Sequence, residues 1–156
     1  MDHQQFIHQQ IIQQTKVENE ALGYETRALE VAIAWAVEGD DCSRKLSSVR
    51  FATDMFQRHL ERVFALEELD GYMEIVCQLQ PELTDQVAVL KREHDQFREA
   101  VRKLVRRLER TSPSDVVRFD AICSDLRNVI RQILEHSRRE NELLVESIDR
   151  DTGGEG

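Results

Sequence analysis

Two histidines and two glutamates of this sequence could bind a metal ion together or pair with one another. His136 and Glu140 lie four residues apart, so a helix would point both side chains the same way. They interrupt an otherwise apolar stripe, and an imidazole or carboxylate taken out of water without a partner costs several kcal/mol. His94 and Glu67 lie at a comparable depth on two other helical segments. Since imidazole nitrogens and carboxylate oxygens together suit iron, zinc or manganese, these four side chains predict a metal site.

A metal-free interpretation of the same residues stays open. A histidine on a helix seam is more often a hydrogen-bonded core residue than a ligand, and His94 alone would be interpreted in that way. Without a metal, His94 would form a buried pair with Glu67 or Glu140, and the nearby negative charge would raise the pKa of the histidine. The metal is favoured because coordinating groups from three helices could meet at one level.

Three breaks divide the chain into the helices that must position these side chains. The first is Gly39-Asp40-Asp41 followed by Ser43, the second is Gln80-Pro81-Glu82, and the third is Thr111-Ser112-Pro113-Ser114-Asp115. We therefore expect one domain over residues 1–150 and a frayed tail over 151–156. Within the domain, the expected helices span residues 4–38, 43–79, 82–110 and 114–149.

Apolar residues in each expected helix recur at alternating steps of three and four, which is the spacing that packs helices into a bundle. In chain order, the seams are Ile12, Thr15, Asn19, Leu22, Thr26, Leu29, Ile33 and Ala36; Val49, Ala52, Phe56, His59, Val63 and Leu66; Val87, Leu90, His94, Phe97, Val101, Leu104 and Leu108; and Ile122, Leu126, Val129, Ile133, His136, Glu140 and Leu143. Short connections favour antiparallel neighbours. The predicted fold is an all-α, up-down-up-down antiparallel four-helix bundle.

The composition fits a single helical domain and excludes several classes of partner. Of the 156 residues, 40% are hydrophobic and 33% charged, with 6 glycines and 2 prolines. This balance is typical of long helices and excludes collagen-like and disordered chains. The formal net charge of −9 repels phosphate backbones and anionic lipids, so we expect no nucleic-acid partner and no membrane partner.

The cysteines and the missing motifs narrow the class of protein further. Cys42, Cys77 and Cys123 are far apart and have no CxxC spacing, so neither a disulfide framework nor a thiolate zinc site is supported. The chain has no signal-peptide architecture and no apolar stretch of about 18 residues, so we expect a cytoplasmic protein. It also has no phosphate loop, no nucleophile elbow and no serine or cysteine flanked by a base, so we expect no enzyme.

Two further groups of residues have plain structural interpretations. Basic residues crowd the end of the third expected helix from Arg98 to Arg110, where they complement the helix dipole. Trp35, Tyr24 and Tyr72 are too scattered to form a platform on which bases stack.

Four segments of the chain resemble the hemerythrin-like (HHE) family. They are HLERVFALEELDGYM at 59–73, LKREHDQF at 90–97, HSRRENELL at 136–144 and IDRDTGG at 148–154. The family pattern is a histidine on the first helix, HxxxE on the second, a histidine on the third and HxxxE on the fourth. The resemblance covers most of the chain and implies an up-down-up-down bundle around two irons.

The sequence departs from that pattern at two positions. Asn19 stands at the place of the first-helix histidine, and Val63 stands at the place of the histidine in the second-helix HxxxE. By position, the resemblance leaves Glu67 as a bridging carboxylate, His94 and His136 as imidazole ligands, and Glu140 as the second carboxylate. Both lost histidines serve the same iron in the family. The resemblance therefore implies an incomplete di-iron site and argues against reversible oxygen carriage.

Two residues could compensate for the losses. His59 lies one turn before Val63, about 6 Å along the helix axis, and helical side chains lean further toward the amino end, away from Glu67. We therefore regard His59 as a less favoured ligand and as a more plausible boundary residue. Asn19 could offer its amide oxygen, a weak ligand for a transition metal, but an asparagine on a seam more commonly fixes helix register.

The leading hypothesis is a hemerythrin-like protein that binds a single iron or zinc ion through Glu67, His94, His136 and Glu140, and that acts in redox, oxygen or metal sensing. Its expected partners are the metal ion, a small diatomic ligand and a second copy of the chain in a homodimer. The alternatives are a metal-free bundle that acts as a protein-interaction scaffold, and an oxidase or peroxide-handling enzyme that needs His59 or another group to rebuild the second metal position.

Overall fold

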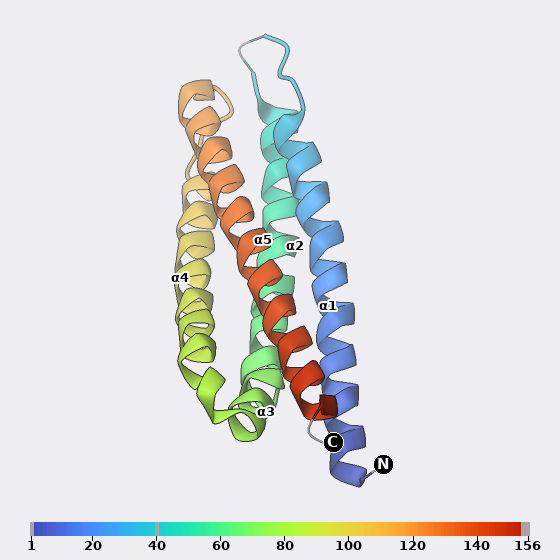
Figure 1. Ribbon diagram of the computed structural model, residues 1–156. Coiled ribbons are helices and arrows are strands. Elements are labelled where there is room, and N and C mark those ends of the chain that lie inside the picture. Colours follow the sequence, from blue (N-terminus) through green and yellow to red (C-terminus); the bar gives the residue numbers. More distant parts are fainter. Residues whose placement is uncertain (1, 40, 154–156) are drawn as a thin grey trace.

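Four long helices form an antiparallel up-down-up-down bundle, as the sequence predicts (Figure 1). The computed structural model describes residues 2–39 and 41–153. A short fifth helix and one turn of 3₁₀ helix lie between the second and third long helices. The elements are α1 (His3–Ala34), α2 (Ser43–Glu68), α3 (Tyr72–Leu79), η1 (Pro81–Leu83), α4 (Thr84–Glu109) and α5 (Val116–Gly153). The described residues contain no β-strand.

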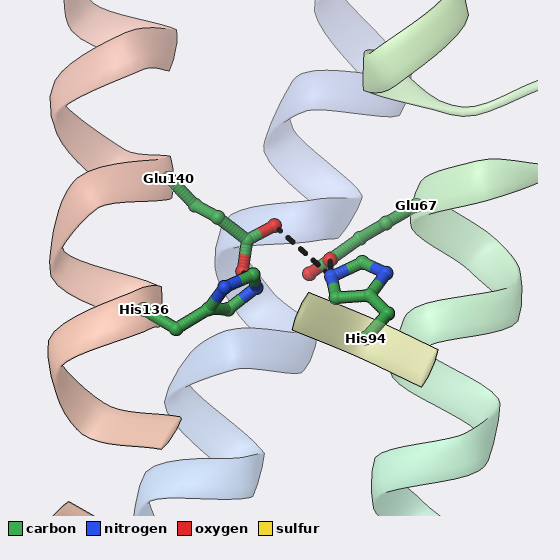
Figure 2. A group of neighbouring side chains, drawn as sticks. All are labelled: Glu67, His94, His136 and Glu140. Atoms are coloured by element: carbon green, nitrogen blue, oxygen red, sulfur yellow. Dashed lines mark ion pairs between the residues drawn. The ribbon is translucent and has the colours of Figure 1, made fainter. Parts of the chain in front are cut away.

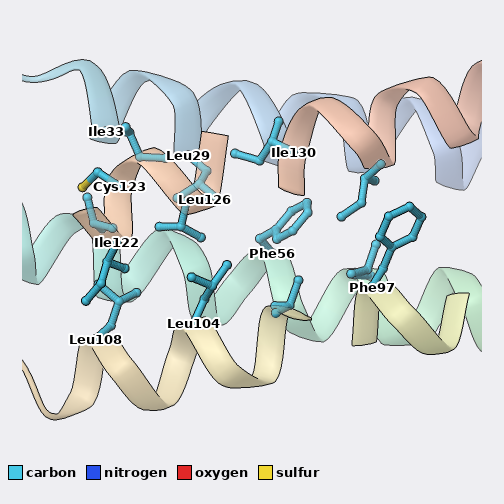
Figure 3. Close-up of a cluster of buried hydrophobic side chains, with 14 of the residues drawn as sticks. Leu29, Ile33, Phe56, Phe97, Leu104, Leu108, Ile122, Cys123, Leu126 and Ile130 are labelled. Atoms are coloured by element: carbon cyan, nitrogen blue, oxygen red, sulfur yellow. The ribbon is translucent and has the colours of Figure 1, made fainter. Parts of the chain in front are cut away.

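An apolar core fills the bundle on the side of the α1–α2 and α4–α5 connections (Figure 3). All seven residues of the seam predicted for the third long helix are buried in α4. The α1 seam is also confirmed from Thr15 to Ile33, whereas Ala36 lies beyond the helix and is exposed. In α2 the buried stripe runs through Thr53 and Leu60 instead of Ala52 and His59, which are half-buried at its edge.

One helix is broken where the sequence analysis expected it to continue. The predicted helix over 43–79 ends at Glu68 and restarts at Tyr72. Asp70 has a left-handed backbone with φ of 52°, and a Cβ atom at Gly71 would overlap the carbonyl oxygens of Leu66 and Glu67. Only glycine fits so close to the preceding turn. The Asp70-Gly71 pair is therefore a fourth break, and it changes the direction of the chain immediately after Glu67 and Glu68.

The two ends of the chain differ in small ways from expectation. Helix α1 ends at Ala34, four residues before the predicted end. Helix α5 continues to Gly153, because no helix-breaking residue precedes that glycine, so residues 151–153 of the expected tail are helical. Residues 154–156 of that tail lie outside the described residues. Among the described residues, no helix is both long and apolar enough to cross a membrane.

Candidate metal centre

Four buried side chains from three helices meet inside the bundle (Figure 2). Glu67 comes from the end of α2, His94 from the middle of α4, and His136 with Glu140 from adjacent turns of α5. Each is at most 1% exposed. One potential ligand atom from each residue lies within 4.8 Å of the other three. The structure thus brings together all four residues singled out in the sequence, and their role as ligands stays a prediction.

Both imidazole rings turn their Nε2 atoms toward the carboxylates. His94 Nε2 lies 3.1 Å from a Glu67 oxygen and 3.8 Å from a Glu140 oxygen. His136 Nε2 lies 2.9 Å from the other Glu140 oxygen. Glu140 therefore lies between the two rings, and the four side chains enclose a common point.

Each ring is held from its outer side by a second carboxylate. The Nδ1 atom of His94 donates a hydrogen bond of 2.9 Å to Glu68, and that of His136 donates one of 3.0 Å to Glu93. A carboxylate on Nδ1 fixes the tautomer of a neutral imidazole and leaves the Nε2 lone pair facing inward. Protein metal sites commonly orient their histidines in this way.

Arginines hold these outer carboxylates in turn. Arg98 donates two hydrogen bonds to Glu68, of 3.0 and 2.9 Å, and Arg139 donates one to Glu93. Burial tends to raise the pKa of both carboxyl groups, but the hydrogen bonds from arginine and histidine outweigh it and hold each pKa below its ordinary value. Glu68 and Glu93 therefore stay ionised beside the rings. Arg98, which the sequence analysis assigned to the helix dipole, supports the centre instead.

Aromatic rings fix the orientation of the imidazoles. Phe64 stacks on His94, with ring centroids 3.8 Å apart and planes 10° from parallel. Phe97 meets His136 edge to face, with centroids 5.3 Å apart. Packing on two sides leaves the rings little freedom to rotate away from the carboxylates, so the site is preorganised.

Tyr72 completes the polar shell, and the chain break after α2 places it there. Its hydroxyl donates a hydrogen bond to Glu140, and its side chain is fully buried. In an uninterrupted helix, Tyr72 would lie five residues after Glu67 and on a different face. Burial and the negative charges of Glu140 and Glu67 raise the pKa of Tyr72, so the hydroxyl stays a hydrogen-bond donor.

The pKa values of the two inner carboxyl groups, Glu67 and Glu140, are shifted in opposite directions. Burial raises the pKa of Glu67 well above its ordinary value, and the nearby charge of Glu140 raises it further. Burial also acts on Glu140, but the close approach of His136, His94 and Glu67 to its carboxylate outweighs burial and lowers its pKa. Without a cation, Glu67 therefore holds a proton while Glu140 is ionised, because two adjacent buried carboxylates do not both ionise readily. A bound cation would stabilise both carboxylates in their charged form.

Several inward atoms have unsatisfied hydrogen-bonding capacity. Within the described part of the chain, both oxygens of Glu67 and the Nε2 atoms of His94 and His136 are buried and make no hydrogen bond of ordinary geometry. Buried polar atoms are rarely left in this state. Two imidazole nitrogens and carboxylate oxygens form a donor set that suits iron or zinc. The residues present therefore fit a metal ion.

On the α1–α2 side of the centre, Val63, Asn19 and His59 are not part of the group of potential ligands. Val63 is buried and cannot coordinate, and the half-buried side chain of Asn19 has no hydrogen-bond partner among the described residues. His59 is absent from the four-residue group. Its Nε2 lies 3.3 Å from Glu18 and its Nδ1 lies 3.1 Å from Glu25, both on α1. The structure therefore gives His59 a bridging role between helices and does not support it as a replacement ligand.

A small cavity reaches the centre from the same side. Its volume is about 90 Å³, and Thr15, Glu18, Val63 and Glu67 are among the residues that line it. The cavity therefore lies between α1 and α2, next to Glu67.

Sequence reasoning missed the outer members of the site. Glu68 and Glu93 lie next in sequence to Glu67 and His94, but exposed-looking glutamates in an acidic chain gave no reason to select them. The signal that could have found Tyr72 is the Asp70-Gly71 pair, since Asp-Gly is a typical turn dipeptide.

The comparisons with known proteins agree with this geometry. The family model described as the hemerythrin HHE cation binding domain matches residues 8–148, which is most of the chain. No curated protein and no solved structure matches the sequence.

Proposed function

Because the chain belongs to the hemerythrin HHE cation-binding domain family, we propose that it binds one metal ion, iron or zinc, through Glu67, His94, His136 and Glu140. The observation that carries this proposal is the set of buried, inward-facing donor atoms without hydrogen bonds, held in place from outside by Glu68 and Glu93. A second metal ion is not part of the proposal, since Asn19 and Val63 replace two imidazoles.

Each of these residues would have its own role at such a metal site. His94 and His136 would hold the ion through Nε2, and Glu67 and Glu140 would supply oxygen ligands and balance its charge. Iron would bring one-electron redox chemistry to the site, and zinc would bring Lewis acidity. Phe64 and Phe97 exclude water from the ring faces, while Tyr72 keeps Glu140 oriented by its hydrogen bond.

We further propose that the protein acts as a sensor of redox state, oxygen or metal, rather than as an oxygen carrier or an enzyme. The cavity beside Glu67 has room for a diatomic molecule at the ligand-poor side of the centre. Reversible oxygen carriage of the hemerythrin type draws electrons from two irons, and one retained set of imidazoles provides for one ion. The three free cysteines fit a cytoplasmic location, which we propose as well.

The test is the metal content of protein purified without an affinity tag, followed by anaerobic titration of the metal-free protein with Fe²⁺ and Zn²⁺. We expect saturation near one ion per chain and loss of that binding in His136→Ala. A stoichiometry near zero in both proteins, with both correctly folded by circular dichroism, would overturn the proposal.

A metal-free scaffold is the second candidate function, and one observation favours it. The inner residues already form acid–imidazole pairs, His136 with Glu140 at 2.9 Å and His94 with Glu67 at 3.1 Å. Such pairs can compensate one another in a bundle that works only through protein contacts. The same titration separates the two functions, because a scaffold would bind neither ion.

A further inference from the structure

The outer face of α1 carries a regular apolar stripe that no part of the described chain covers. Its six members lie at alternating steps of four and three residues: Val17, Ala21, Tyr24, Ala28, Val31 and Trp35. The four large members are between 51% and 72% exposed. The stripe lies on the opposite side of the helix from the buried seam through Leu22 and Leu29.

The spacing of the stripe is that of a coiled-coil seam. Single exposed hydrophobic residues are normal on a protein surface, but an alternating step of three and four keeps them in one line along a helix. Helix α1 packs on α2 and α5 with its other side and lies at the edge of the bundle (Figure 1). Its outer face is therefore accessible to another helix along several turns.

The two flanks of the stripe differ in charge. On the α2 side, Glu18 and Glu25 are turned onto His59. On the α5 side, Glu20 and Arg27 are exposed and form no ion pair or hydrogen bond with any described residue. They are seven residues apart, too far to pair with each other along one helix. An antiparallel copy of the same helix would present the opposite charge to each of them.

A hollow lies on the same flank, between α1 and α5. Its volume is about 350 Å³, and its lining includes Gly23, Tyr24, Arg27 and Leu134. Gly23 is in the interior of α1, and a Cβ atom there would meet nothing within 4 Å. Glycine is among the least favourable residues inside a helix. Neither local packing nor backbone conformation requires it, so the hollow provides a place where another surface can approach the α1 backbone.

We propose that α1 is the interface of a homodimer in which two copies pack their outer faces in antiparallel orientation about a two-fold axis near Gly23. In this register Ala21 lies opposite Tyr24 of the second copy, and Val17 lies opposite its Ala28. Glu20 then faces Arg27 of the second copy, and the symmetry makes this pair twice. The inference does not depend on the metal.

The charges favour this arrangement over one shifted by a heptad and over a parallel one. A shift of one heptad would place Arg27 against Arg27 of the second copy. A parallel arrangement would place Glu20 against Glu25 of the second copy. Both alternatives set like charges side by side, which opposes association. The proposed register pairs the free charges on the α5-side flank. On the other flank it brings Glu18 near Glu25 of the second copy, where both carboxylates already face His59 of their own chain.

The first test is analytical ultracentrifugation of the whole chain over a range of concentrations. We expect a concentration-dependent dimer, and we expect Ala28→Glu to weaken it by at least about 30-fold because that change places a charge opposite Val17 in the apolar seam. The matched control is Val117→Glu, at an 83% exposed valine at the start of α5, which should leave the dimer unchanged. Circular dichroism checks that both variants fold.

A charge exchange then tests the register. Glu20→Arg and Arg27→Glu should each weaken self-association by about 10-fold, and an equimolar mixture of the two variants should form a heterodimer at least as stable as the original dimer. A wild-type chain that stays monomeric would overturn the proposal and would indicate that a different protein binds the stripe. A dimer that Ala28→Glu does not weaken, or a mixture that does not associate, would overturn it as well.

Discussion

The histidine rings on the two sides of the metal centre face different partners. On the α4–α5 side, His94 and His136 are each held by one outer carboxylate through Nδ1 and keep Nε2 directed inward. On the α1–α2 side, His59 faces a glutamate with each ring nitrogen, and both glutamates belong to the surface of α1. In His94 and His136 the second nitrogen faces a buried carboxylate of the four-residue group, whereas both nitrogens of His59 face half-buried glutamates of α1 outside that group.

The difference shows that the presence of a histidine near a site is a weaker criterion than what its second ring nitrogen faces. A ring whose Nε2 faces buried carboxylates around a common point can coordinate an ion with them, while a ring between two glutamates of a neighbouring helix serves as a bridge between helices. Glu68 and Glu93 therefore matter as much to the centre as the rings that they hold.

The largest effect is expected from removing a ring on each side. His94→Ala should reduce metal binding by more than about 100-fold, since ligand loss exceeds the 10–100-fold typical of outer partners. His59→Ala should leave metal affinity within about twofold, because the ring nitrogens face Glu18 and Glu25 and the ring is outside the four-residue group. Titration with Zn²⁺ measures both, and equal losses in the two variants would contradict the contrast.

The second prediction restores imidazoles to the deficient side. Asn19→His combined with Val63→His should raise bound iron from one toward two per chain and produce near-ultraviolet oxo-iron absorption on exposure to air. Val63→His alone is the control and should stay near one. An unchanged metal count and spectrum in the double variant would mean that these two positions do not face the centre as assigned.

The third prediction concerns the outer carboxylates. Glu68→Gln and Glu93→Gln keep an acceptor for Nδ1 but remove the charge, so metal affinity should fall by about 10–100-fold in each. Glu61→Gln alters a surface glutamate of α2 that pairs with Arg102 and should have no effect. If the glutamine variants bind metal as tightly as the original chain, the outer carboxylates do not tune the rings.

A smaller effect is expected at Tyr72. Tyr72→Phe removes one hydrogen bond to Glu140, while His136 still holds the other carboxylate oxygen. Net hydrogen-bond contributions of about 1 kcal/mol correspond to roughly a fivefold loss of metal affinity. Tyr24→Phe, at an exposed tyrosine of α1, is the matched control. A loss as large as that of His94→Ala would show that Tyr72 does more than orient Glu140.

The smallest effect is a dependence on pH. As pH rises, the stability of the metal-free protein should fall, while the affinity for metal should increase. Burial tends to lower the pKa of His136, but Glu140 and Glu93 outweigh it and raise the pKa above its ordinary 6.5. The resulting stability is present below that value and is lost as pH rises through the raised pKa. Metal affinity should increase over the same interval, because protons compete for Nε2.

Urea unfolding measures the first trend and competition titration the second. Metal-free protein whose stability rises through this interval would contradict the assignment of His136, as would metal affinity that falls.

The sequence was sufficient for most of the fold because the apolar spacing in α1, α4 and α5 is regular, and it also identified the four buried donors. In α2 it placed only alternate positions of the stripe one residue too early, since Ala52 and Thr53, or His59 and Leu60, fit the spacing almost equally well. The break at Asp70-Gly71 was missed because an apolar pattern continues across it. The outer partners depend on which way exposed glutamates turn, and tertiary contacts decide that.

X-ray absorption spectroscopy of the metal-loaded chain would show directly whether both imidazole rings bind the ion. One ion per chain, with imidazole scattering from two rings and nitrogen and oxygen ligands at about 2.0–2.2 Å for zinc, is the predicted result. Replacing His59 should leave that signal unchanged. An ion with no imidazole ligand, or a spectrum that depends on His59, would contradict the account.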